Sequence, residues 1–439
     1  KKDSDGILMN KKYISFIIFF CLSNCSFNTN SSFWTKERNT FEDKSTTKII
    51  IDKKKNTLNE FNPNFKIKLP KNIGIIKDKM LNNDGFVDFD GSLERVSKYN
   101  FKKINYFENF EPEILLDDKN IFYFDNKGSI IKFDSNSQLL WKKNHYSKLD
   151  KKLNPILFYA SQEKFLFIAD SIANYYVINK ITGDLIWKKK HSSSFNSQIK
   201  IFNDKVLVID QENSLRCFSL KNGVLLWTVK TERSLLRSKK KQSIILHENN
   251  VFFTNSIGDI TAVNLEDGNI VWQTPTQSFV SFGSTFSLKL SDLVSDKKSI
   301  FISNNKDQFF SVDIKSGVIN WKQEISSELR PAIIQNYLIT ISDRGLLIVL
   351  KKETGEIIRI NDLFKNMKEK KKKDYQPVGF IIGKKNIYLT TTNGRICIID
   401  FEKGEIEKIL KLDNNKLQRP AYFNKNLYIA KENSIIKLN

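Results

Sequence analysis

The sequence predicts an all-β protein: an eight-bladed β-propeller of four-stranded antiparallel blades, closed by pairing of its N- and C-terminal strands. One phrase, made of alternating apolar residues, a polar turn ending in glycine, three further residues and a tryptophan, recurs along the chain. The copies fall roughly 40 to 50 residues apart, a period typical of propeller blades. The strand-like runs are short, polar turns separate them, and no long stretch has helical periodicity.

The repeated phrase predicts a structural role for its tryptophans. The clearest copy runs from Ile260 to Trp272. Repetition around a ring marks a scaffold, and an indole at a fixed offset from the turn can fill the gap between neighbouring blades. Two later copies keep the glycine but end at Arg359 and Lys408, so we expect the ring to be loosest there. The predicted blade tryptophans are Trp141, Trp187, Trp227, Trp272 and Trp321.

The number of blades follows from counting hairpins. Each repeat contains a further strand pair before the phrase, as at 164–170 and 250–255, which gives four strands per repeat. Seven copies of the phrase are present, and 425–438 supplies one more hairpin without its outer strand. The best donor of that strand is 93–101, so eight blades are predicted over residues 93–439. A seven-bladed ring is the alternative.

The first part of the chain reads as a leader and a tether. Residues 1–24 are predicted to be a signal peptide whose true start is Met9, because two lysines precede an apolar run, 13–22, that is too short to span a membrane. The run ends in Leu-Ser-Asn-Cys25, which resembles a bacterial lipobox and implies a lipid on Cys25, although Asn24 departs from the pattern. An ordinary signal peptide is the alternative. Residues 25–92 are predicted to be a flexible tether or N-terminal extension.

The charge of the chain does not define a partner. The formal net charge is +22, but the excess is spread along the whole chain, so no nucleic-acid site is predicted. Two basic runs, 239–241 and 368–374, are predicted to be exposed loops. They could touch anionic lipid headgroups, and a simple solvated surface is the alternative.

The sequence offers no catalytic constellation, so no enzyme, metal or cofactor is predicted. The three histidines are widely spaced, and none has a partner at metal-ligand spacing. Cys217 and Cys397 lie in strand-like stretches far apart and are expected to be small core residues. No nucleophile–base arrangement, phosphate-binding glycine loop or carboxylate pair stands out.

The repeated phrase resembles the PQQ-type repeat, and the ring with its leader resembles the BamB family of outer-membrane assembly lipoproteins. Two segments carry the likeness: 232–238 (ERSLLRS), and 282–285 (FGST) followed by 290–292 (LSD). The resemblance implies that these loops bind the BamA-type barrel subunit through its periplasmic domains. The partner-binding residues it implies are Leu235, Leu236, Arg237 and Asp292, and the second aspartate of the family pattern falls on Val294.

The resemblance also implies function and location. The expectation is a non-catalytic scaffold lipoprotein on the periplasmic face of the outer membrane, a monomer within its complex, which assists the insertion of β-barrel proteins. Blade edges could hold unfolded outer-membrane proteins by β-augmentation. Two alternatives stay open: a PQQ-dependent quinoprotein dehydrogenase, because the same repeat builds those enzymes, and an envelope adaptor with a different partner.

Overall fold

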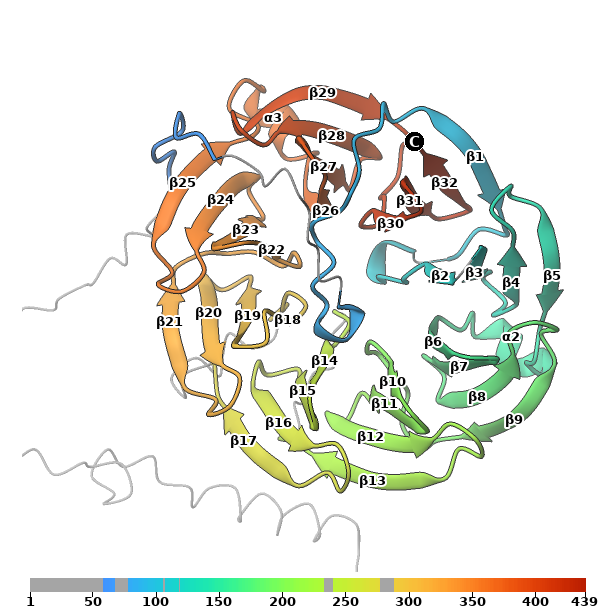
Figure 1. Cartoon of the computed structure of the whole chain (residues 1–439). Helices are drawn as coiled ribbons and strands as arrows, with labels where there is room; N and C mark the ends of the chain where they lie inside the picture. Colours follow the sequence, from blue (N-terminus) through green and yellow to red (C-terminus); the bar gives the residue numbers. More distant parts are fainter. Residues whose placement is uncertain (1–57, 68–77, 106, 118, 233–239, 277–287) are drawn as a thin grey trace, which may run out of the picture. The chain divides into compact units, whose positions relative to one another are not determined.

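The computed structural model shows a closed ring of eight four-stranded antiparallel sheets (Figure 1). It describes residues 58–67, 78–105, 107–117, 119–232, 240–276 and 288–439. The predicted signal peptide, Cys25, and the predicted partner residues Leu235, Leu236 and Arg237 lie outside the described residues. The predicted all-β class and the eight blades are confirmed, and the seven-bladed alternative is wrong.

The first four blades follow one another along the chain, each with its innermost strand first and its outermost strand last. Blade 1 consists of β2 Leu115–Asp117, β3 Asn120–Phe124, β4 Ile130–Phe133 and β5 Leu139–Lys143. Blade 2 consists of β6 Leu157–Gln162, β7 Phe165–Asp170, β8 Asn174–Asn179 and β9 Leu185–Lys190. Blade 3 consists of β10 Lys200–Phe202, β11 Lys205–Ile209, β12 Ser214–Ser219 and β13 Leu225–Lys230. Blade 4 consists of β14 Ile244–His247, β15 Asn250–Thr254, β16 Ile260–Asn264 and β17 Ile270–Thr274.

The remaining blades repeat this order, except that the last takes its outermost strand from the start of the ring. Blade 5 consists of β18 Val294–Ser295, β19 Ser299–Asn304, β20 Gln308–Asp313 and β21 Ile319–Gln323. Blade 6 consists of β22 Ala332–Ile334, β23 Tyr337–Ile341, β24 Leu346–Lys351 and β25 Ile357–Asp362. Blade 7 consists of β26 Pro377–Ile382, β27 Asn386–Thr391, β28 Arg395–Asp400 and β29 Glu405–Lys411. Blade 8 consists of β30 Ala421–Phe423, β31 Asn426–Lys431, β32 Ser434–Leu438 and β1 Arg95–Asn100.

Helical structure among the described residues is confined to four short turns: η1 Lys79–Leu81, η2 Phe107–Asn109, α2 Lys148–Lys152 and α3 Glu369–Lys372. None of the described helices is long and apolar enough to cross a membrane. The ring closes where the sequence predicted, because β1 pairs antiparallel with β32, with Arg95 opposite Leu438 and Asn100 opposite Ser434. The Leu93 N–H also donates to the Asn439 carbonyl at 2.6 Å. The chain ends therefore hold each other within one sheet.

The blade tryptophans dock each outer strand onto the next blade. Each indole lies against the turn glycine of the following blade; Trp227, for example, packs where a side chain at Gly268 would stand. Gly268 has φ +77°, a conformation that disfavours side chains. Each indole N–H also donates to a main-chain carbonyl of the next blade, at 2.9 to 3.2 Å. The tryptophans therefore set the spacing of blades 1 to 6.

Arg359 takes the tryptophan position of blade 6, and the expectation of a loose junction there is wrong. Its side chain is fully buried. The guanidinium donates to the carbonyls of Phe401 and Glu402, both at 2.7 Å, in blade 7. Phe401 follows β28 as Leu265 follows β16, so Arg359 reaches the same place on the next blade as Trp227 does. An arginine thus replaces the indole without opening the ring.

Residues 58–67, which we call the strap, lie along the outer edge of blade 6. Phe61 and Ile360 exchange two main-chain hydrogen bonds, at 3.1 and 2.8 Å, and form an antiparallel bridge. The side chain of Arg359 also donates to the Phe65 carbonyl at 3.1 Å, and Asn361 donates to the Pro63 carbonyl at 3.1 Å. The strap therefore extends this sheet by β-augmentation from within the chain.

Residues 78–91, which we call the channel segment, pass through the centre of the ring (Figure 1). Asn82 donates to side chains or carbonyls in three successive blades: Gln198 at 2.9 Å, Ser243 at 3.2 Å and Leu293 at 3.0 Å. The side-chain amide oxygen of Asn82, Oδ1, accepts from Lys200 Nζ at 2.7 Å. The centre of this propeller is thus filled by its own chain.

Candidate partner-binding face

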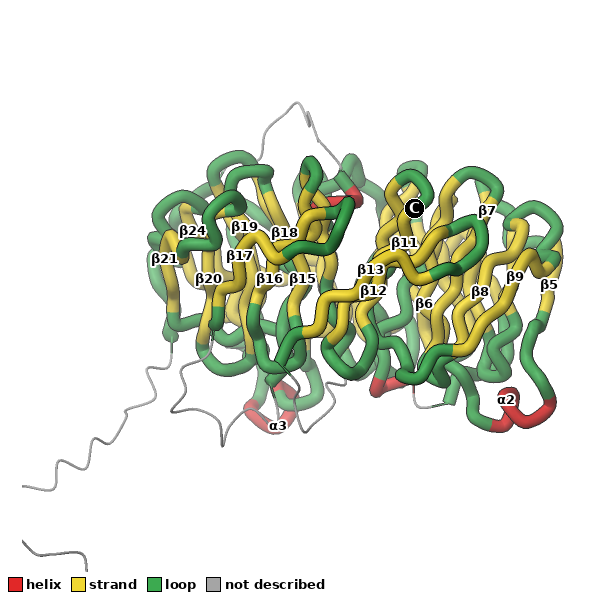
Figure 2. The backbone as a smooth tube through the Cα atoms, turned by 90° about the horizontal axis from the view of Figure 1, so that it is seen from below, coloured by secondary structure: helices red, strands yellow, loops and turns green. Residues whose placement is uncertain are grey.

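One end of the ring carries every connection from the outermost strand of a blade to the innermost strand of the next. This follows from the topology, because four antiparallel strands return the chain to the end at which it entered the blade. Helices α2 and α3 lie in two such connections, and Figure 2 shows both at the same edge of the ring. We call this end the connecting face. In the sequence, both segments that carry the family resemblance fall in connections between blades, one before β14 and one before β18; residues 233–238 and 282–285 are outside the described residues.

Asp292, the one predicted partner residue within the described residues, lies two positions before β18. Its carboxylate accepts from Arg330 Nε at 2.7 Å and lies 2.5 Å from Arg330 Nη2. Burial alone would raise the pKa of Asp292, but the Arg330 guanidinium, with Lys241 and Lys240, holds that pKa well below its usual range. Asp292 therefore stays ionised and is engaged within the protein. Its role in partner binding stays a prediction.

Arg330 connects Asp292 to two other parts of the chain. Its guanidinium lies 3.0 Å from Asp84 of the channel segment and 3.1 Å from Glu113, just before β2. Burial would lower the pKa of Arg330, but these three carboxylates raise it well above its usual value. Arg419 also reaches Asp84, at 3.2 Å. A single buried arginine thus ties together three segments that are far apart in the sequence.

Lys240 and Lys241 are not the exposed basic loop that the sequence predicted. Their side chains are only 11% and 6% exposed, and they pair with Glu111 at 2.6 Å and Glu113 at 2.5 Å. The prediction was wrong because their acidic partners lie far away in the sequence. The prediction of an exposed loop is confirmed for the second basic run, where five of the lysines around α3, at 368, 370, 371, 372 and 373, are exposed or partly exposed.

The ion pairs of Lys240, Lys241 and Arg330 form a network of paired charges on the connecting face, which we call the charged collar. Sequence reasoning found Asp292 but missed the others. Most of them precede an innermost strand by one to five residues, and that position is the only signal that could have found them. The collar consists of Asp84, Glu111, Glu113, Lys240, Lys241, Asp292, Arg330 and Arg419.

The collar brings the two predicted partner connections together. Lys240 and Lys241 follow Arg237 by three and four positions, and both act electrostatically on Asp292. The base of the first connection therefore lies beside Asp292 of the second. Where Leu235, Leu236 and Arg237 themselves lie is outside the described residues.

A second candidate surface runs around the outer rim of blades 1 to 5. At the start of each outermost strand, or one residue before it in blade 5, stand two apolar residues that are 39% to 62% exposed. In blade 6 the equivalent residues, Ile357 and Ile358, are only partly exposed. Ile357 and Leu58 of the strap pack against the same apolar cluster of the ring. The exposed pairs are Leu139–Leu140, Leu185–Ile186, Leu225–Leu226, Ile270–Val271 and Val318–Ile319.

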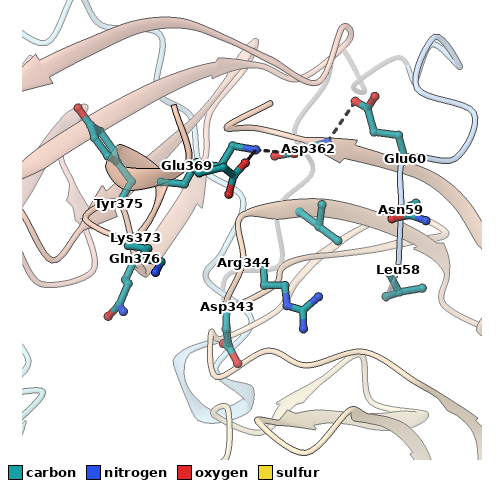
Figure 3. Close-up of a pocket in the computed structure, with 12 residues that line it drawn as sticks. Leu58, Asn59, Glu60, Asp343, Arg344, Asp362, Glu369, Lys373, Tyr375 and Gln376 are labelled. Atoms are coloured by element: carbon teal, nitrogen blue, oxygen red, sulfur yellow. Dashed lines mark hydrogen bonds and ion pairs between the residues drawn. The ribbon is translucent and has the colours of Figure 1, made fainter. Parts of the chain in front are cut away.

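A cavity of about 910 Å³ lies between the strap, the turn before β24 and the α3 segment (Figure 3). Its lining mixes both signs of charge, with Lys372 lying 3.0 Å from Glu369 and 3.7 Å from Asp362. Asp343 accepts from Ser326 at 2.8 Å, so this carboxylate is held by the ring itself. Because Lys372 is paired with these two carboxylates, the three groups do not form a patch of one charge that would attract an oppositely charged ligand.

The described residues contain no group of three His, Cys, Asp or Glu side chains that could hold a metal ion. His145 lies 3.0 Å from the Gly183 carbonyl, and His191 contacts the Ser193 backbone. Cys217 and Cys397 lie buried in different sheets, and burial raises the pKa of each thiol to about 12. The donor set thus offers neither paired thiols nor a ligand cluster within the described part of the chain.

The closed ring and its repeated phrase define a class of protein: an eight-bladed propeller of PQQ-type repeats. A family model described as "Outer membrane protein assembly factor BamB" matches residues 126–361, more than half of the chain, and the chain belongs to this family. The protein of that name from Legionella pneumophila is 21% identical over 209 residues, which cover 45% of this chain and 48% of the relative. The chain thus matches about half the length of that relative.

Solved structures show the same fold. The crystal structure of BamB from Moraxella catarrhalis superposes with a TM-score of 0.66 at 16% identity, covering 79% of this chain and 100% of that one. Quinohemoprotein alcohol dehydrogenase from Comamonas testosteroni superposes with a TM-score of 0.61 at 8% identity, covering 80% and 78%. At these identities the likeness concerns the fold alone, and it includes an enzyme.

Proposed function

We propose that the protein is a non-catalytic scaffold of outer-membrane β-barrel assembly, and that its connecting face binds the BamA-type subunit. Membership of the BamB family is the observation that carries this proposal. The geometry supports it, because the charged collar brings Asp292 beside the base of the connection that contains Leu235, Leu236 and Arg237. An arginine and neighbouring leucines suit a docking site, since arginine pairs with carboxylates or carbonyls and leucines can be buried as anchors.

We further propose that a lipid on Cys25 holds the ring at the periplasmic face of the outer membrane. The lipobox-like residues before Cys25 and the family membership support this location. The outer rim is the proposed site for unfolded β-barrel clients. The strap supports this part, because it is a segment that pairs with the outer edge of blade 6 through Phe61 and Ile360.

Co-purification tests the partner site. Arg237→Glu should reduce the amount of BamA-type subunit recovered with the protein by at least tenfold, because a reversed charge would repel the groups that arginine binds. Arg95→Glu, an equal charge reversal at an exposed position where the outermost strand of blade 8 begins, is the matched control and should leave recovery unchanged. Equal recovery with Arg237→Glu and the parent chain would contradict the site.

The rival function is a quinoprotein dehydrogenase, and the likeness to quinohemoprotein alcohol dehydrogenase is the observation that favours it. Titration of the purified protein with PQQ and Ca²⁺ distinguishes the two functions. The scaffold proposal predicts no saturable binding and no dye reduction with alcohols. Saturable binding with alcohol-dependent dye reduction would establish the enzyme instead.

A further inference from the structure

The connection between β5 and β6 forms an ordered projection on the connecting face, residues 147–153, which we call the prong. Helix α2 is its core (Figure 2). Ser147 caps this helix: its hydroxyl accepts from the Asp150 N–H at 3.1 Å and donates to the Asp150 carboxylate at 3.0 Å. The Lys151 N–H donates to the Ser147 carbonyl at 3.1 Å. The prong therefore has a defined shape of its own.

The base of the prong is fixed to the ring on both sides. Before it, Tyr146 is buried, and its hydroxyl donates to Asp170 at 2.6 Å. After it, Ile156 is buried, and its backbone N–H donates to the Ser171 hydroxyl oxygen at 3.0 Å. The apolar residues next to the prong are thus packed into the ring.

The apolar residues of the prong itself are not packed. Leu149 and Leu153 are 74% and 63% exposed, and Leu149 is the most exposed large apolar side chain of the described residues. They stand four positions apart across one helical turn, so they lie on the same side of the prong. An ordered loop that holds two leucines in water, while its neighbours are buried, presents them to something outside the ring.

Positive charge surrounds the two leucines. The prong contains three lysines, at 148, 151 and 152, and one acid, Asp150, whose carboxylate accepts from Ser147. Lysines around a short apolar tip are the pattern of segments that rest on anionic bilayers: the apolar residues enter the headgroup boundary, and the long lysine side chains reach the phosphates. An acidic protein surface would attract the lysines but would give the leucines no apolar environment unless it also had a groove.

We infer that the prong is a membrane contact, which inserts Leu149 and Leu153 into the surface of an anionic lipid bilayer. This inference stands apart from the proposed partner site, because it concerns a different connection of the same face. The α3 segment offers a comparison within the molecule. It has more lysines than the prong, but none of the large apolar side chains within residues 365–376 is exposed. The α3 segment therefore has the positive charge of the prong but no exposed apolar side chain that could insert into a bilayer.

Fluorescence from single labels tests the inference in the full chain. An environment-sensitive dye on Leu149→Cys should shift to the blue, and a nitroxide on the lipids should quench it at least threefold more than the same dye on Val318→Cys. Val318 is 62% exposed on the outer rim and is the matched control. The vesicles contain phosphatidylglycerol and phosphatidylethanolamine, with phosphatidylcholine vesicles for comparison. Labelling of the parent chain gives the background from native cysteines, and thermal melts confirm that each variant is folded.

The outcomes separate insertion from simple attraction. The inference predicts quenching at position 149 on anionic vesicles, at least threefold weaker quenching on phosphatidylcholine, and a similar loss when Lys148, Lys151 and Lys152 are changed to Gln. Changing Lys370, Lys371 and Lys373 to Gln should alter quenching at position 149 by less than twofold. Equal quenching at positions 149 and 318 would overturn the inference. Protection of the dye by a protein partner but not by lipid would also overturn it and would assign the prong to that partner.

Discussion

Two neighbouring junctions of the ring are held by different side chains. A tryptophan connects blade 5 to blade 6, and an arginine connects blade 6 to blade 7. In the first, Trp321 packs against Gly355 and donates to the Lys352 carbonyl at 2.9 Å. In the second, Arg359 donates to the Phe401 and Glu402 carbonyls, and the strap covers it from outside. At the equivalent position of blade 7, Lys408 is exposed. In the two junctions compared, the position instead holds a large side chain that donates a hydrogen bond to the next blade. The indole of Trp321 fills this position alone, whereas the guanidinium of Arg359 also binds the strap through the Phe65 carbonyl.

The largest expected effect comes from removing the indole. Trp321→Ala should lower the free energy of unfolding by about 3 to 5 kcal/mol, because it leaves a cavity between blades 5 and 6 and removes a hydrogen bond. Trp321 also packs near Phe301 and Phe309, so the surroundings have little room to collapse. Trp321→Phe keeps a ring and should cost less. Urea unfolding measures both, and equal loss in the two variants would show that packing of the ring contributes little.

Removal of the guanidinium should have a smaller but still large effect. Arg359→Ala leaves the carbonyls of Phe65, Phe401 and Glu402 without this donor and should cost about 2 to 4 kcal/mol. Hydrogen exchange adds a local measurement: the amides of Phe61 and Ile360 should exchange faster, because the strap loses its side-chain contact. Unchanged protection of these amides would show that the strap is held independently of Arg359.

The third effect is the pH dependence of the stabilisation by the charged collar. It compares the centre of the ring with the blade junctions at the rim. The folded-state pKa of Asp292 is lowered, so its pairing with Arg330 stabilises the protein above the unfolded pKa, near 4, and this contribution is lost as pH falls below that value. Asp292→Asn should therefore cost about 2 to 4 kcal/mol at pH 7. The difference from the parent chain should shrink below about pH 4. A difference that is the same at pH 7 and pH 3 would contradict the pairing.

The repeat made the propeller fold predictable from the sequence. The segments outside the repeat could not be predicted in this way. Turn glycines and tryptophans recur at fixed offsets, and these offsets indicated where each blade lies in the sequence. The last hairpin has no outer strand of its own, which indicated that 93–101 closes the ring. The strap and the channel segment carry no repeat. Their partners are reached only through folding, as with Asp84 and Arg330, which lie 246 residues apart.

The candidate site was predictable in the same limited sense. Asp292 came from a family resemblance, while its partner Arg330 is an ordinary charged residue in the sequence, 38 positions further on. Arg359 looked like a lost tryptophan, because the carbonyls that it binds belong to the next blade. The pairs in the collar depend on which residues precede the innermost strands, and only the closed ring brings those positions together.

The central claim is that the connecting face binds the BamA-type subunit through the connections before β14 and β18. Hydrogen exchange of the full chain, with and without the periplasmic domains of that subunit, tests this most directly. We expect added protection in 231–243 and 275–293, and no change at the outer strands β5 and β9. Protection confined to the outer strands, with the two connections unchanged, would contradict the claim.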